Sequence, residues 1–247
     1  MNNKGKYSVN FDNLSLWKDT LCKYNNTSIK KPSNNFTIIT GSGRCGTTAF
    51  TSFMKATGFF HMMIGNYLED MRGGLEIGDV AVANSLCSKD IIFPQYDHNN
   101  LLEGMDLIKK IVEITEISKS PSFFFYNSYE YWKKSAPQED IQVFLLKRDN
   151  QDNVLKSAKK TSNEQDWSYF KNGEEIKKHY KLNVQTLKNL DIPFIELEFP
   201  KFITDPVYLF HKLEKYKPLS EQKNFNLNFV KNISSKVFEK SLVTIKK

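Results

Sequence analysis

The chain has 247 residues, of which 40% are hydrophobic and 13% aromatic, so it can bury one large core and is not a disordered chain. Its net charge of +7 suits a phosphate-bearing ligand, an anionic surface or nucleic acid. Cys22, Cys45 and Cys87 are too few and too far apart for a disulfide framework or a zinc site. No stretch is apolar enough for a signal peptide or a membrane span, so we expect a cytoplasmic protein.

Two regions differ in composition. Residues 1–34 are polar and rich in Asn and Lys, and we interpret them as an N-terminal extension. Residues 35–247 alternate short apolar runs with amphipathic stretches. This alternation predicts a single α/β domain with a mainly parallel central sheet flanked by helices.

A glycine loop lies between the first predicted strand, 35–40, and the first predicted helix, 47–57, which Gly58 ends. Glycines let successive backbone N–H groups turn inward, and the helix N-terminus adds positive potential. The loop and helix start therefore predict a phosphate site, in which Cys45 fills space. Its residues are Gly41, Ser42, Gly43, Arg44, Cys45, Gly46, Thr47 and Thr48.

The remaining elements follow from apolar periodicity and from helix-start and helix-stop signals. We expect further strands at 59–61, 111–117, 141–146 and 194–198. We expect further helices at 77–87, 101–110, 122–135, 151–160, 174–189 and 207–216, the last with Asp205 as its N-cap. Residues 88–100 and 161–172 read as loops, and the chain from 217 onwards as helical or irregular.

Three basic residues stand where predicted strands end: Arg44, Lys119 and Arg148. The carboxyl ends of parallel strands meet at one edge of a sheet, which is where such sheets bind ligands. We therefore expect these three cations to converge on a multiply anionic ligand.

The loop nearly fits the ATP- and GTP-binding pattern G-x-x-x-x-G-K-S/T, with Gly41, Gly46 and Thr48 in register. Thr47 stands in the lysine position, and in nucleoside triphosphatases that lysine reaches the β- and γ-phosphates. Its replacement counts against ATP hydrolysis and kinase chemistry. The loop's cation is Arg44 instead.

The run from Arg44 to Thr48 after a strand resembles the 5′-phosphosulfate loop of sulfotransferases that use 3′-phosphoadenosine 5′-phosphosulfate (PAPS). Segments 119–121, 143–149 and 194–216 are similar to that family in the same order, so the resemblance covers roughly residues 35–216. It implies a fold like that of the P-loop-containing nucleoside triphosphate hydrolases. It also implies PAPS as co-substrate, 3′,5′-adenosine bisphosphate as product and no metal.

The resemblance also implies roles for individual residues. Arg44 and the loop would hold the 5′-phosphate and the sulfuryl oxygens, and Lys119 the bridging oxygen. Arg148 would bind the 3′-phosphate together with Ser157 or Lys156, and Phe199 would contact the adenine. The acceptor would be a hydroxyl or amine of a carbohydrate or small molecule.

The candidates for the general base are His61, Glu69 and Asp70. The choice is left open between Glu69, His61 and neither of these two. The histidine that serves as base in the cytosolic members of the family would fall on Pro121. The chain therefore resembles the bacterial or carbohydrate-acting branches, in which a glutamate supplies the base.

Two alternatives stay open at this point. One is a P-loop nucleotide kinase or triphosphatase, and the other is a non-enzymatic nucleotide-binding protein. We do not expect a nucleic-acid partner, because the basic residues form no stripe with interleaved aromatics.

Overall fold

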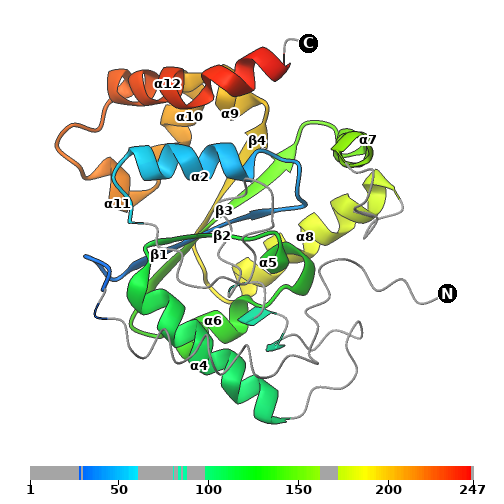
Figure 1. The fold of residues 1–247 in the computed structure, drawn as a ribbon, viewed down its shortest axis with the longest axis vertical. Helices are drawn as coiled ribbons and strands as arrows, with labels where there is room; N and C mark the ends of the chain where they lie inside the picture. Colours follow the sequence, from blue (N-terminus) through cyan, green and yellow to red (C-terminus); the bar gives the residue numbers. More distant parts are fainter. Residues whose placement is uncertain are drawn as a thin grey trace.

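The computed structural model describes residues 28, 30–60, 98–161 and 172–245, together with Val80, Ala83, Asn84, Leu86 and Cys87. Within these residues four strands form one all-parallel sheet in the order β2-β1-β3-β4 (Figure 1). The strands are β1 (Asn35–Gly41), β2 (Ile117–Lys119), β3 (Asp140–Arg148) and β4 (Phe194–Phe199). The prediction of a parallel α/β sheet flanked by helices is confirmed.

Helices cover both faces of the sheet (Figure 1). One face carries α2 (Thr47–Ala56), α9 (Lys201–Thr204), α10 (Pro206–Leu213), α11 (Lys217–Ser220) and α12 (Leu227–Ile245). The other carries α4 (His98–Ile114), α5 (Ser122–Tyr126), α6 (Tyr129–Ser135), α7 (Asp152–Thr161) and α8 (Gly173–Asn189). Because both faces are buried, the central strands need apolar side chains at nearly every position, as in the run 141–146 of β3.

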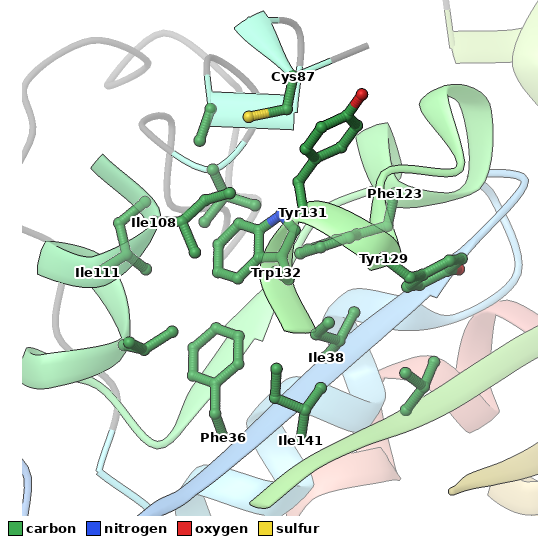
Figure 2. Packing of buried hydrophobic residues seen from close by; sticks show 14 of the residues in the cluster. Phe36, Ile38, Cys87, Ile108, Ile111, Phe123, Tyr129, Tyr131, Trp132 and Ile141 are labelled. Atoms are coloured by element: carbon green, nitrogen blue, oxygen red, sulfur yellow. The ribbon is translucent and has the colours of Figure 1, made fainter. Parts of the chain in front are cut away.

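The core on the α4 side is built around Trp132 (Figure 2). Its ring stacks on Phe36 of β1 at 5.2 Å between centroids and lies 4.9 Å from Phe123. On the other face Phe50 of α2 contacts Phe144 of β3 at 4.7 Å between centroids. That contact holds α2 against the sheet directly after the glycine loop.

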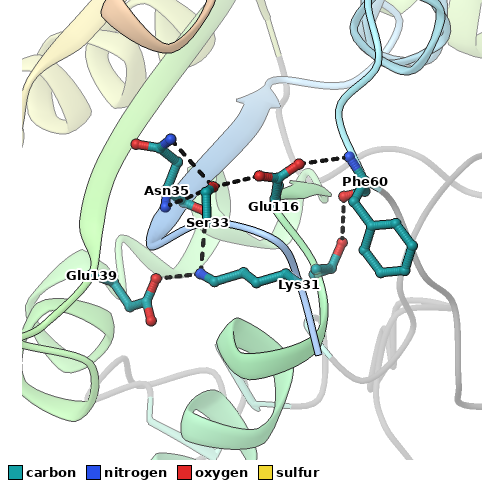
Figure 3. A network of polar contacts seen from close by, with 7 residues as sticks. Lys31, Ser33, Asn35, Phe60, Glu116 and Glu139 are labelled. Carbon is teal, nitrogen blue, oxygen red and sulfur yellow. Dashed lines mark hydrogen bonds and ion pairs between the residues drawn. The ribbon is translucent and has the colours of Figure 1, made fainter. Parts of the chain in front are cut away.

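Buried polar contacts close the opposite, amino-terminal end of the sheet (Figure 3). Lys31 forms an ion pair with Glu139, and Ser33 donates a hydrogen bond to the Glu116 carboxylate. Burial lowers the pKa of Lys31, and the contact with Glu139 acts in the opposite direction. Residues 31–33, which we had placed in the N-terminal extension, are thus bonded to the residues that precede β2 and β3.

The strand predicted at 59–61 is wrong for Phe59 and Phe60, which lie in no strand, whereas His61 is outside the described residues. The backbone N–H of Phe60 donates to the Glu116 carboxylate at 2.8 Å, and its carbonyl accepts from the Glu116 N–H at 2.9 Å. The side chain and the backbone of one buried residue, Glu116, therefore provide the hydrogen bonds that a neighbouring strand would otherwise make to Phe60.

The strand predicted at 111–117 is also wrong, because α4 continues to Ile114 and β2 begins only at Ile117. The fully buried side chains of Leu107, Ile108, Ile111 and Val112 recur with a helical period. The alternation in 111–117 was therefore the end of a helical stripe.

The single helix predicted at 122–135 is two helices, α5 and α6, separated at Asn127. Asn127 has a left-handed φ of 51° and donates a hydrogen bond to Thr186 of α8 at 2.7 Å. The helix predicted at 207–216 is shorter, Pro206–Leu213, but its cap is confirmed. The Asp205 carboxylate accepts from the N–H groups of Val207 and Tyr208 at 3.0 and 2.9 Å.

Candidate anion-binding site

The site predicted from sequence lies where β1 and β3 end. These strands are neighbours, but α2 after β1 packs on one face of the sheet and α7 and α8 after β3 pack on the other. The chain therefore leaves the two strands in opposite directions. In parallel sheets this is the position at which ligands bind.

The loop from Gly41 to Gly46 depends on its glycines. Gly43 and Gly46 have left-handed φ angles of 76° and 84°, and Arg44 between them has a φ of 52°. Gly41 has no such angle, but a Cβ there would lie 2.4 Å from the Leu146 carbonyl oxygen of β3. The loop is thus a curled backbone held close against the neighbouring strand.

Gly46 is the N-cap of α2, and as a glycine it has no side chain with which to cap this helix start. The first turn of α2 contains no acidic residue, so nothing on the helix itself neutralises the positive end of its dipole. A Cβ on Gly46 would lie 2.5 Å from the Phe199 ring and 2.8 Å from the Phe202 ring. The start of α2 is therefore packed closely against the end of β4 and against α9.

Cys45 lies inside the loop and is fully buried, as expected for a residue that fills space. Burial raises the pKa of its thiol to about 11. The positive charge of Lys119 and backbone groups of the loop oppose this rise. The thiol is therefore neutral at physiological pH and is a poor nucleophile.

The raised pKa predicts a loss of stability at alkaline pH. An acid with a higher pKa in the folded than in the unfolded protein stabilises the fold fully below its unfolded pKa, and this contribution is lost as the pH rises through the folded pKa. For Cys45 the loss should run from about pH 9 to about pH 11. Between about pH 8 and about pH 11, wild type should lose roughly 2 kcal/mol more stability than Cys45→Ala. Urea unfolding at both pH values measures this difference, and equal losses in the two proteins would contradict it.

Arg44 and Arg148 meet at the sheet edge, as the sequence predicts. Arg148 is the last residue of β3, and its Nη1 donates to the Arg44 carbonyl oxygen at 3.0 Å. The Nε of Arg44 donates to the Ser157 hydroxyl of α7 at 3.2 Å. The guanidinium of Arg148 lies over the Phe199 ring, 5.0 Å from its centroid. Four residues predicted from sequence thus form one contiguous group, Arg44, Arg148, Ser157 and Phe199.

One donor of this group is unused. The Nε of Arg148 is buried, and it has no hydrogen-bond partner within the part of the chain that the structure describes. Leaving a buried donor unpaired costs about 1–3 kcal/mol, more when the group is charged. An anion at Arg148 would remove that cost, so this atom is the strongest sign of a ligand site.

Lys119 reaches the same loop from β2, the strand on the other side of β1. It pairs in register with Ile39 and is only 3% exposed. Its positive charge opposes the rise in the pKa of the Cys45 thiol. Because Ile39 belongs to the core on the α2 side, Lys119 leaves β2 on the face of the sheet that carries α2 and the glycine loop. The described part of the site therefore has an exposed cation, Arg44, a half-buried one, Arg148, and a buried one, Lys119.

The remaining predicted residues divide into two groups. Ser157 contacts Arg44, and the neighbouring Lys156 is exposed. Which of the two acts together with Arg148 stays a prediction. Both candidates for the general base, His61 and Glu69, lie outside the described residues. Sequence reasoning missed that Arg148 also holds the loop backbone, because a bond to a carbonyl oxygen leaves no residue-type signal.

The chain matches no known protein-family profile, and no similar sequence was found among curated proteins. In the described parts of the chain no three His, Cys, Asp or Glu residues gather as metal ligands. Across those same parts, every helix is too short or too polar to cross a membrane.

Proposed function

We propose that the protein is a sulfotransferase with a P-loop-like nucleotide site, which moves a sulfuryl group from PAPS to a hydroxyl or amine of a carbohydrate or small molecule. The observation that carries the proposal is Arg148, whose guanidinium lies on Phe199 and contacts the loop at Arg44. Its buried Nε has no hydrogen-bond partner among the residues that the structure describes. A nucleoside with phosphate at both its 3′ and 5′ positions would bridge Arg148 and the glycine loop.

The positions of the anion-binding groups support this proposal. Arg148 and Ser157 would receive the 3′-phosphate, and the glycine loop and the start of α2 the 5′-phosphate. Phe199 offers an aromatic face next to both groups. The arrangement suits a ligand with two separate anionic ends better than a triphosphate, for which Thr47 replaces the usual lysine.

In the proposed reaction the acceptor oxygen or nitrogen attacks the sulfur atom in line. The bond between sulfur and the oxygen of the 5′-phosphate breaks, and 3′,5′-adenosine bisphosphate leaves with the electron pair. Lys119 and Arg44 would stabilise the negative charge that builds on the bridging and sulfuryl oxygens. The acceptor proton passes to a base, for which Glu69 and His61 are the proposed candidates.

A transfer assay tests the proposal. Purified protein is incubated with PAPS labelled in the sulfuryl group and with a panel of glycans, phenols, alcohols and amines, and products are separated by mass. We expect label in at least one acceptor class together with an equal amount of the bisphosphate. ATP with magnesium serves as the parallel reaction. Turnover of ATP without any transfer of label would refute the proposal in favour of a P-loop kinase or triphosphatase.

A further inference from the structure

A chain of buried hydrogen bonds leads away from the glycine loop. It begins at Thr40, the residue before Gly41. The Thr40 hydroxyl donates a hydrogen bond to the Ser120 carbonyl oxygen at 2.8 Å. The hydroxyls of Ser120 and Ser122 lie 2.6 Å apart, and the Asn84 side-chain amide donates to Ser122 at 2.7 Å. All four side chains are buried, so solvent does not compete for these bonds.

Asn84 is the hub of this chain. It is fully buried, and its Oδ1 accepts from the Ser128 hydroxyl and from the Trp132 indole N–H, both at 2.6 Å. The residues around it, such as Val80 and Ala83, belong to the apolar core on the α4 side. Burying an amide in an apolar core costs free energy unless all its hydrogen bonds are made. We therefore expect the function of Asn84 to be the orientation of the groups that it bonds.

The residue that these hydrogen bonds affect is Lys119, the neighbour of Ser120 in the sequence. In an extended chain neighbouring side chains point to opposite faces. Ser120 faces Ser122 and Asn84. Lys119 pairs in register with Ile39, which belongs to the core on the α2 side, so Lys119 faces the side of the sheet that carries the glycine loop and α2. The Ser120 N–H donates to the Ile39 carbonyl oxygen of β1 at 3.1 Å. Ser120 is therefore held by its backbone N–H, its carbonyl and its hydroxyl, and this fixes the direction in which Lys119 leaves the strand.

We propose that Asn84 is a positioning residue that acts through Ser122 and Ser120 to hold the buried Lys119 side chain on the face of the sheet that carries the glycine loop and α2. The consequence for catalysis rests on the proposed function, in which Lys119 stabilises the leaving oxygen. The position of Lys119 does not depend on the proposed function: Lys119 is buried, and Ser122 links Asn84 to Ser120 by hydrogen bonds.

The test compares two serines that bond to the same amide. Ser122→Ala removes the link between Asn84 and Ser120, whereas Ser128→Ala removes a bond on the side of Asn84 away from Lys119. Each protein is treated briefly with an amine-acylating reagent, and modification of Lys119 is measured by peptide mass spectrometry. Lys147, whose side chain is 36% exposed, is the internal reference.

We expect Ser122→Ala to raise the modification of Lys119 about tenfold relative to Lys147, because loss of one buried hydrogen bond makes opening about 1.4 kcal/mol easier. Ser128→Ala should leave the modification of Lys119 near the wild-type value. Thermal unfolding of both variants shows whether each is folded. Asn84→Leu, which removes all three hydrogen bonds of the amide, should raise the modification of Lys119 further. Equal modification in Ser122→Ala and Ser128→Ala, or none above wild type in Ser122→Ala, would overturn the inference.

The acylation result does not require enzyme activity, so it separates this inference from the proposed function. If wild type transfers label from PAPS, Ser122→Ala should lower kcat while KM for PAPS stays unchanged, because Lys119 acts on the transition state. A rise in KM with unchanged kcat would contradict the positioning role. If wild type transfers nothing, the proposed function fails and the acylation pattern alone decides the inference.

Discussion

Gly46→Ala should lower the free energy of unfolding by about 2–4 kcal/mol and abolish the nucleotide binding that we propose. Gly46 has a φ of 84°, which is unfavourable for alanine, and its Cβ would lie 2.5 Å from the Phe199 ring and 2.8 Å from the Phe202 ring. These rings belong to the packed end of β4 and to α9, so they cannot move aside without opening the core. Urea unfolding followed by circular dichroism measures the loss.

Gly58→Ala is the matched control for that prediction. Gly58 also has a left-handed φ, 102°, but a Cβ there would meet nothing within 4 Å. This variant should lose only the backbone contribution, about 1 kcal/mol, and should still bind nucleotide. If the two alanine variants lost the same stability, close packing at Gly46 would not be what holds the loop in place.

Arg148→Ala should weaken binding of 3′,5′-adenosine bisphosphate by about 10–100-fold, because hydrogen bonds to a charged group contribute about 1.5–3 kcal/mol. A smaller loss, about threefold, should appear for AMP. AMP has no 3′-phosphate, but Arg148 also holds the Arg44 carbonyl oxygen and thereby the shape of the loop. Isothermal titration calorimetry with both nucleotides gives the two ratios.

Lys147→Ala provides the control for charge alone. Lys147 is the neighbour of Arg148 on β3 and carries the same charge, but its ammonium lies 4.0 Å from Glu196 and from Glu198. Its contact with the Tyr180 ring of α8 places it on the other face of the sheet. We expect its affinity for the bisphosphate to stay within about threefold of wild type. Equal losses in both variants would mean that the basic surface, and not Arg148, binds the ligand.

The sequence predicted those parts of the fold that depend on local signals. The β-branched run of β1, the glycines before α2 and the Asp205-Pro206 cap each act over a few residues, and all three occur as predicted. The boundary between α4 and β2 was wrong because apolar residues such as Ile111 and Val112 satisfy a helical period as well as a strand-like one. The break at Asn127 depends on a contact with Thr186, 59 residues further along the chain.

The site could be predicted in outline but not in its contacts. Arg44 and Arg148 meet because parallel strands end at one edge, a rule that needs only the order of the elements. The bond from Arg148 to a backbone carbonyl and the role of Asn84 could not be predicted. Asn84 joins Ser122, Ser128 and Trp132 only after α5 and α6 have packed on the sheet, and a lone Asn in a sequence is more often exposed.

We propose that Arg44, Arg148 and the glycine loop form a site for a nucleoside carrying phosphate at both ends. Calorimetric titration of the wild-type protein with 3′,5′-adenosine bisphosphate and, separately, with AMP tests it most directly. We expect the bisphosphate to bind at least about tenfold more tightly, since its 3′-phosphate would accept from the Arg148 Nε, which has no partner in the described parts of the chain. Equal affinity for the two nucleotides would contradict it.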